Sequence, residues 1–232
     1  MSDLSSFPIA KRWPAADPSV LQLYSYPTPN GVKASIALEE MGIPYEAHLV
    51  TLSDVDVKSP EFLSLNPNNK IPAIVDPNGP DGTPIGLFES GAILIYLAEK
   101  TGQLIGTNAT QKAHTIQWLM FQMGGLGPML GQLGFFWKFA GSEWEDKRPQ
   151  QRYVTEGKRL LAVLEKQLDG QDWITGSYSI ADIAIAPWLR ALDFYGAKDV
   201  LGWEDHPNLV AYLDRFMARP AVGKAINIPP RP

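Results

Sequence analysis

Two short stretches of the sequence carry residues that could bind a small peptide. In the first, Ile71-Pro72 enters a short apolar run that reads as a β-strand, Ala73 to Asp76. A proline is tolerated at the first residue of a strand but not in its middle, because it has no N–H group. We therefore expect the N–H and C=O groups of Ile71 to face outward. There they could pair with an extended peptide, as an added strand does.

The second stretch is Glu89-Ser90, which precedes a helical pattern of apolar residues at Ile93, Leu94 and Leu97. We place Ser90 at the N-cap of this helix. A serine hydroxyl and the first N–H groups of a helix attract a carboxylate, with help from the helix dipole. Glu89 could hold an ammonium group. Together with the backbone of Ile71, these groups predict a site for a short zwitterionic peptide.

Each stretch also has a purely structural interpretation. Pro72 could simply open a strand, and Ser90 could simply cap a helix. Taken alone, each of these interpretations is the commoner one. The two stretches occur together, however, and with the turn Thr28-Pro29-Asn30-Gly31 upstream of both. The combination favours a ligand site.

The elements that would position these residues form a recognisable order. Residues 21–26 read as a strand, 32–41 as a helix and 45–51 as a second strand. A short helix begins at Ser59-Pro60. The strand that Pro72 enters, a strand ending at Phe88 and a helix over 90–100 follow. This order predicts an α/β thioredoxin-like domain, in which a small mixed sheet is flanked by helices.

Everything after this domain reads as helix. We expect the following organisation, given by residue range: an extended arm at 1–20, the thioredoxin-like domain at 21–102, a linker at 103–109, an all-α C-terminal domain at 110–225 and a tail at 226–232. A proline ends or kinks a helix, so Gly124 to Pro128 should interrupt the first long helix of the second domain. Ser179 and Asp182 form a helix-start signature, and we assign Asp182 a role in folding rather than in catalysis.

Composition excludes several classes of function. The chain has 232 residues and a net charge of −5, which argues against nucleic acid as a partner. No apolar run is long enough to span a bilayer, and no signal peptide is visible, so we expect a cytoplasmic protein. The absence of cysteine excludes disulfides, thiolate zinc sites and a thiol nucleophile from the protein itself. Three scattered histidines, His48, His114 and His206, lack metal-ligand spacing, so no metal is expected.

Several motifs together resemble the nu class of the cytosolic glutathione transferases. This class includes bacterial disulfide-bond oxidoreductases and relatives of a yeast nitrogen-regulating prion protein. The resemblance covers about residues 21 to 222. The motifs are Pro-Thr-Pro-Asn-Gly at 27–31, Ser-Pro-Glu-Phe-Leu at 59–63, Asn-Pro-Asn-Asn-Lys-Ile-Pro-Ala-Ile-Val-Asp at 66–76, Phe-Glu-Ser-Gly-Ala-Ile at 88–93 and Gly-Gly-Leu-Gly-Pro-Met-Leu-Gly-Gln at 124–132.

The resemblance implies a glutathione site with assigned residues. It implies a cis Ile71-Pro72 bond, with Ile71 pairing with the cysteinyl backbone of glutathione. Glu89 and Ser90 would hold the γ-glutamyl end. Lys70 could bind a glutathione carboxylate or simply be solvated. Arg152, in an Arg-Tyr pair, would reach a glutathione across a homodimer, unless it is only an exposed helix charge.

The resemblance also implies that the glutathione thiol is held by Thr28 and Asn30. Helix N-termini lower thiol pKa values, and hydrogen-bond donors favour the thiolate further. A plain turn with an asparagine cap is the structural alternative for this segment. Tyr24, Ser25 and Tyr26 are rival thiol partners that we rank below Asn30. The chain would thus bind a nucleophile, with glutathione as co-substrate, rather than supply one.

The implied activity is thiol–disulfide exchange between bound glutathione and a small disulfide, with transfer to electrophiles as a weaker activity. Conjugation or peroxide reduction at the same site is the enzymatic rival. A transferase-like regulatory protein without catalysis is a rival from another class. The first 20 residues lack the asparagine-rich composition of a prion-like arm, which lowers that option. An aromatic and methionine-rich stretch from Trp118 to Trp137 could line an acceptor pocket, although we favour core or dimer contact for most of it.

Overall fold

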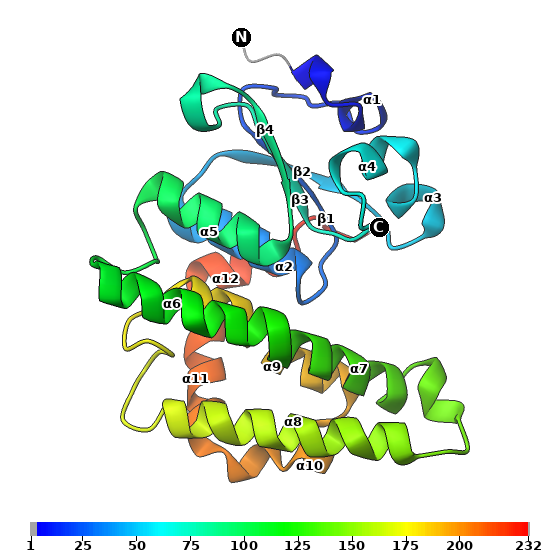
Figure 1. Cartoon of the computed structure of the whole chain (residues 1–232), viewed down its shortest axis with the longest axis vertical. Coiled ribbons are helices and arrows are strands. Elements are labelled where there is room, and N and C mark those ends of the chain that lie inside the picture. The colour runs from blue at the N-terminus through cyan, green and yellow to red at the C-terminus, as the bar shows by residue number, and fades with distance from the viewer. Residues whose placement is uncertain (1–3, 232) are drawn as a thin grey trace. The chain divides into compact units, whose positions relative to one another are not determined.

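The computed structural model describes residues 4–231, and these form two compact units. The first unit comprises residues 4–101 together with 220–231, and the second comprises Gly102–Arg219 (Figure 1). Each unit has its own core and is described separately below. No helix within residues 4–231 has the length and apolar character needed to cross a bilayer.

The first unit is built on a four-stranded mixed sheet (Figure 1). Its strands run in the order β2-β1-β3-β4. Strand β1 is parallel to β2 and antiparallel to β3, and β3 is antiparallel to β4. This is the thioredoxin-like arrangement that the order of elements predicts. The strand bounds are β1 Leu21–Ser25, β2 Tyr45–Leu49, β3 Ala73–Asp76 and β4 Ile85–Phe88.

Helices cover both faces of this sheet. Because side chains alternate across a strand, Tyr24, Ala73 and Val75 point to one face, where they join a cluster with residues of α1 and α4. Leu23 and Ile74 point to the other face, toward α2 and α5, which pack against each other. The helices of the first unit are η1 Leu4–Ser6, α1 Ile9–Arg12, α2 Gly31–Met41, α3 Asp54–Val57, α4 Pro60–Leu65, η2 Pro80–Gly82, α5 Ser90–Thr101 and α12 Pro220–Ala225.

The N-terminal segment differs from the extended arm predicted for residues 1–20, of which 1–3 lie outside the described residues. It contains two short helices, and Leu4 and Ile9 are buried in the cluster on the sheet. Trp13 donates from Nε1 to the carbonyl of Leu49 at 3.0 Å and lies edge-on to Tyr24. The segment is rich in proline and polar residues, yet a few large apolar side chains anchor it to the sheet.

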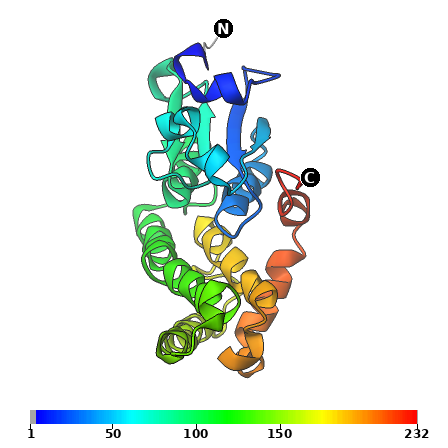
Figure 2. The ribbon, with the colours of Figure 1, turned by 90° about the vertical axis from the view of Figure 1, so that its right-hand side faces the viewer.

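The C-terminal segment also differs from prediction, because it returns to the first unit instead of ending as a tail of the second. Helix α12 begins at Pro220 and packs against α2 (Figure 2). Ser35 Oγ donates to the carbonyl of Ala225 at 3.0 Å, and Val222 and Ala225 are buried. Arg219-Pro220 marks the end of one helix, but the proline also starts the next one.

The second unit is all helical, as predicted. The most buried of its helices is α9, which a capping box begins. The predicted interruption near Pro128 is a π-helical turn that joins α6 to α7. Its helices are α6 Ala109–Phe121, η3 Gln122–Leu126, α7 Gly127–Trp137, η4 Ala140–Glu143, α8 Arg148–Gln167, α9 Ile180–Tyr195, α10 Lys198–Leu201, η5 Trp203–Asp205 and α11 Pro207–Met217.

Candidate functional site

The register of the sheet brings three predicted site segments to one edge of the first unit. Tyr24 of β1 pairs with Ala73 of β3, and Ala73 pairs with Phe88 of β4, so these residues form one row across the sheet. The antiparallel directions place the end of β1, the beginning of β3 and the end of β4 side by side. Neighbouring strands lie about 4.8 Å apart. The turn 28–31, the pair Ile71-Pro72 and the pair Glu89-Ser90 therefore lie together at this end of the sheet.

The Ile71–Pro72 peptide bond is cis, as the resemblance implies. Pro72 is buried and directly precedes β3, whereas Ile71 is half-buried. The ladder begins at Ala73, which is the first residue of β3 with partners on both neighbouring strands. Ile71 thus lies just beyond the ladder, where an extended peptide could align with it.

The loop before this pair is held by Asn66, a residue that the sequence analysis did not single out. Asn66 is only 2% exposed, and its Nδ2 donates to the carbonyl of Lys70. Its Oδ1 accepts from the N–H of Asn68 at 2.9 Å, which is an Asx turn. Asn-Pro-Asn at 66–68 is the turn signal that could have identified it. The side chain of Lys70 itself is exposed at the end of this loop.

Thr28 caps α2. Its carbonyl accepts from the N–H of Val32 at 3.0 Å, and its Oγ1 accepts from the N–H of Gly31 at 3.1 Å. Asn30, the residue before Gly31, has helical φ and ψ angles and makes no side-chain cap hydrogen bond, so its side chain does not cap the helix. Because the Thr28 oxygen accepts within the cap, its hydroxyl proton is directed to another acceptor. A thiolate at the helix start would be such an acceptor.

Two of the three rival thiol partners, Tyr24 and Ser25, lie in β1 and are buried. Tyr24 is 1% exposed, and burial, together with the charge of Glu46, raises the pKa of its phenol. Ser25 is completely buried. Tyr26 is half-buried, and the guanidinium of Arg231 lies 5.3 Å from the centre of its ring. Burial therefore makes Tyr24 and Ser25 poor thiol partners.

Ser90 is the first residue of α5 rather than the residue before it. The carbonyl of Glu89 accepts from the N–H of Ile93 at 2.9 Å, which makes Glu89 the N-cap and corrects our placement of Ser90 by one position. Glu89 is exposed and has a φ of 71°, which is uncommon outside glycine. Residues with a strained backbone, such as Glu89, concentrate at ligand sites. Ser90 itself is 4% exposed.

A buried lysine lies behind Ser90, and the sequence analysis did not anticipate it. Lys33 of α2 is 0% exposed, and its Nζ donates to Ser90 Oγ at 3.3 Å. Burial lowers the pKa of Lys33 to about 7, while the carboxylate of Glu89 acts in the opposite direction. Fully buried lysines are rare, because removing an ammonium from water is costly.

Arg152 belongs to the second unit. It is exposed on α8, and it helps to lower the pKa of Glu156, although hydrogen bonds from Arg159 contribute more. Its contact with glutathione across a dimer stays a prediction.

Asp182 has the structural role that we assigned to it. Its carboxylate accepts from the N–H groups of Ile174 and Ser179 at 3.0 and 2.8 Å, and it closes a capping box with Ser179. Burial raises the pKa of Asp182 to about 6, against these hydrogen bonds. Within residues 4–231, no group of three His, Asp or Glu side chains is arranged to hold a metal ion.

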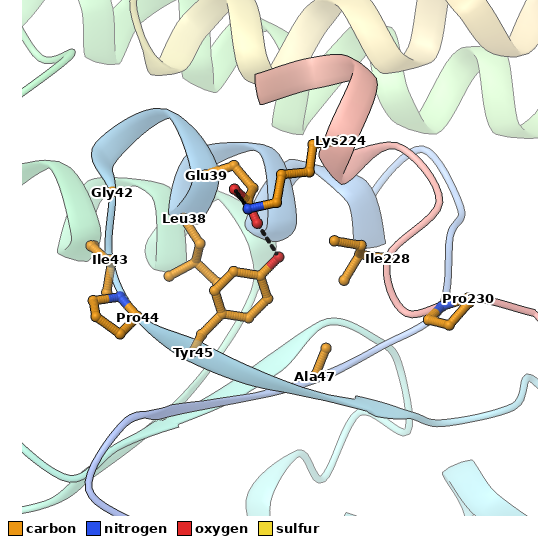
Figure 3. A pocket seen from close by; sticks show the side chains of 10 residues that line it. All are labelled: Leu38, Glu39, Gly42, Ile43, Pro44, Tyr45, Ala47, Lys224, Ile228 and Pro230. Atoms are coloured by element: carbon orange, nitrogen blue, oxygen red, sulfur yellow. Dashed lines mark hydrogen bonds and ion pairs between the residues drawn. The ribbon is translucent and has the colours of Figure 1, made fainter. Parts of the chain in front are cut away.

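A pocket of about 560 Å³ lies elsewhere in the first unit, at the C-terminal end of α2 (Figure 3). Glu39 pairs with Lys224 at 2.7 Å and accepts from the hydroxyl of Tyr45 at 2.9 Å, so the charged groups facing this pocket already have partners. None of the predicted site residues lines it. We therefore place the candidate site at the end of the sheet where β1 and β4 end and β3 begins, and not in this pocket.

Family models match both halves of the chain. The N-terminal domain of glutathione S-transferase matches residues 28–100, and the C-terminal domain of glutathione S-transferase matches residues 149–215. The first match begins at Thr28 and includes every proposed site residue of the first unit.

Individual relatives agree with these matches. The disulfide-bond oxidoreductase YfcG of Escherichia coli is 43% identical over 215 residues, which cover 89% of this chain and 94% of the relative. A glutathione transferase from Burkholderia graminis, with two glutathione molecules bound per subunit, is 64% identical, with a TM-score of 0.98 and coverage of 100% and 98%. One from Pseudomonas putida, with one glutathione disulfide per subunit, is 58% identical, with a TM-score of 0.96 and coverage of 98% and 99%. The chain belongs to the glutathione S-transferase family.

Proposed function

We propose that this protein is a glutathione-dependent disulfide reductase. The observation that carries the proposal is the meeting of three segments at one end of the sheet: the capped turn at Thr28, the cis pair Ile71-Pro72 and the start of α5 at Ser90. The names and ligands of the relatives support it, since they include a disulfide-bond oxidoreductase and transferases bound to glutathione or its disulfide.

In this proposal glutathione lies across this end of the sheet. The backbone of Ile71 pairs with the cysteinyl residue, as a short added strand. Ser90 and the first turn of α5 receive the α-carboxylate of the γ-glutamyl residue, and Glu89 receives its ammonium group. Lys70 binds the glycyl carboxylate. Arg152 of a second copy of the chain completes the site in a homodimer.

The thiol then points to the first turn of α2. Thr28 donates its hydroxyl proton to the sulfur, and Asn30 donates from its amide. The positive end of the helix dipole adds to the stabilisation of the thiolate. An unperturbed thiol has a pKa of about 8.5, so lowering this value by about one unit raises the thiolate fraction severalfold at neutral pH.

The reaction is two successive thiol–disulfide exchanges. The glutathione thiolate attacks one sulfur of the substrate disulfide, which forms a mixed disulfide and releases the other sulfur as a thiolate. A second glutathione thiolate attacks the glutathione sulfur of the mixed disulfide and releases the second product thiolate. The disulfide gains two electrons, and two glutathiones become glutathione disulfide. A chain without cysteine needs both thiols from the peptide.

We place this reaction in the cytoplasm, where the glutathione pool is reducing enough to drive it. Transfer of glutathione to electrophiles, and hence a part in detoxification, is a weaker activity of the same thiolate. Peroxide reduction would use the same thiolate as well. Because all three reactions need the same activated sulfur, Thr28 and Asn30 serve each of them.

The test is turnover of a small disulfide, bis(2-hydroxyethyl) disulfide, with glutathione and with glutathione reductase as the coupling enzyme. We expect the wild type to be active, and Asn30→Ala and Thr28→Ala each to lose tenfold or more in kcat/KM. Lys11→Met is a matched control, because Lys11 is exposed on α1. Full activity in both site variants would contradict the thiol assignment. Tight binding of glutathione without turnover would instead favour the regulatory protein.

A further inference from the structure

The buried Lys33 has no part in the proposed site as described so far. It is the third residue of α2, and its side chain reaches from that helix to the first residue of α5, which is 57 positions away in the sequence. Burying an ammonium group is unfavourable unless a partner compensates for the lost hydration. Burial lowers the pKa of Lys33 to about 7, so near neutral pH the group carries a proton in a large fraction of molecules. The fold thus buries an amine next to Ser90 that is a cation when it is protonated.

The direction of the Lys33–Ser90 hydrogen bond is fixed by the chemistry of the two groups. A lysine ammonium has three donors and no acceptor, whereas a serine hydroxyl has one donor and two acceptor positions. At 3.3 Å, Nζ donates and Ser90 Oγ accepts. The proton of the Ser90 hydroxyl therefore points at something other than the ammonium group. The first turn of α5, which adds N–H donors and a positive dipole end, begins at the same residue.

Glu89 and Lys33 place opposite charges near Ser90, since Glu89 precedes it in the chain and Lys33 donates to its hydroxyl. Glu89 is exposed, with a positive φ that directs the chain into α5, and Lys33 is buried on the inner side. The free end of a γ-glutamyl residue also carries opposite charges, an α-ammonium and an α-carboxylate on one carbon. A carboxylate at Ser90 would be attracted by Lys33, while the ammonium group would be attracted by Glu89.

We propose that Lys33 is a positioning residue that makes the site specific for peptides with an α-carboxylate on the γ-glutamyl residue. It holds Ser90 Oγ as an acceptor, so that the serine proton donates to that carboxylate, and its charge adds attraction from behind. This inference rests on the proposed glutathione site but assigns a residue that the site does not otherwise use. Lys33 acts through Ser90 and does not touch the reacting sulfur.

The experiment compares two ligands on two proteins by calorimetry at about pH 6.5, below the pKa of about 7 to which burial lowers the Lys33 ammonium group. The ligands are S-methylglutathione and the S-methyl form of γ-aminobutyryl-cysteinyl-glycine, which lacks only the α-carboxylate and keeps the amino group. We expect Lys33→Met to bind S-methylglutathione roughly tenfold more weakly than the wild type does. We expect it to bind the truncated peptide within about twofold of the wild type. Lys11→Met, at an exposed lysine of the same unit, should match the wild type with both ligands.

The outcomes separate the inference from the proposed function. An equal loss for both peptides would mean that Lys33 only supports the fold, and no loss for either would mean that it is irrelevant; both results overturn the inference while glutathione binding stands. If the wild type fails to bind S-methylglutathione at all, the proposed function fails, and the inference fails with it.

Two further variants keep the test independent of folding defects. Lys33→Gln retains a hydrogen-bond donor without the charge, and we expect a smaller loss that is again confined to the ligand with the carboxylate. In a Ser90→Ala background, Lys33→Met should weaken the binding of S-methylglutathione by less than half of the factor that it causes in the wild-type background, because the hydroxyl that Lys33 orients is gone. Independent effects of the two substitutions would contradict the proposed coupling.

Discussion

A Cβ atom on Gly31 would lie 1.8 Å from the carbonyl oxygen of Tyr26 and 2.7 Å from Ser25 Oγ. No other residue can therefore occupy the start of α2 while β1 and its following turn keep their positions. This close approach sets where Thr28 and Asn30 stand relative to the end of the strand.

We predict that Gly31→Ala displaces the turn that carries Thr28. Stability should fall by about 1–3 kcal/mol from overpacking, and disulfide reduction should fall up to about 100-fold, because small displacements of reacting groups are costly. Gly223→Ala is the matched control, since a Cβ there meets nothing within 4 Å. It should be neutral or slightly stabilising in urea unfolding and in the coupled assay. Normal activity in Gly31→Ala would show that the turn tolerates the shift.

The substitutions Thr28→Ala and Asn30→Ala should differ in stability. Thr28 caps α2 through Oγ1, whereas Asn30 makes no cap bond. Thr28→Ala should therefore lose about 1 kcal/mol of unfolding free energy through the broken cap, a contribution that Asn30→Ala leaves intact. Both should raise the pKa of the bound glutathione thiol by about one unit, which ultraviolet absorbance of the thiolate measures. A lower stability in Asn30→Ala than in Thr28→Ala would contradict this division of roles.

Lys33 should give the wild type a characteristic pH dependence of stability. The pKa of Lys33 is about 7 in the folded protein and about 10.4 in an unfolded chain, so between these values the unfolded state binds more protons. Stability contributed by this group then rises with pH, by at most about 1.4 kcal/mol per unit. The free energy of unfolding, measured in urea, should rise more for the wild type than for Lys33→Met between about pH 7 and pH 9. Parallel pH curves for the two proteins would rule out a lowered pKa for Lys33.

Asp182→Asn should destabilise the protein without weakening glutathione binding. An amide in place of the carboxylate would direct an NH₂ group at one of the N–H donors of Ile174 or Ser179, which leaves that donor unpaired. The expected cost is about 1–3 kcal/mol at neutral pH, measured by urea unfolding. Asp169→Asn is the control, because Asp169 is exposed. A change in the affinity for glutathione at unchanged stability would give Asp182 a role that we have not assigned.

Much of the first unit was predictable because its elements carry local signals. The alternation at Leu21 to Ser25 and the turn before Gly31 give the first strand and helix almost residue for residue. Pro72 and Ser90 were found from the same kind of signal, although the cap of α5 is one residue earlier than expected. These positions follow from backbone chemistry within a few residues.

What escaped prediction depends on contacts between distant parts of the chain. Lys33 reads as an ordinary exposed residue of a helix, and it becomes buried only because the sheet register brings α5 next to α2. Ile9 lies in a segment rich in proline and polar residues, yet it is fully buried. The helix after Pro220 is short, and nothing local indicates that it belongs to the first unit.

The pairing of α12 with α2 makes the first unit discontinuous in the sequence, because residues 220–231 complete it after the whole second unit has intervened. During synthesis, the glutathione-binding half must therefore wait for the last helix before α2 can be covered. A fragment that stops at Thr101 would leave this flank of α2 exposed and prone to aggregate. A bulky fusion directly after Ala225 would disturb the first unit, which contains the matched glutathione S-transferase N-terminal domain.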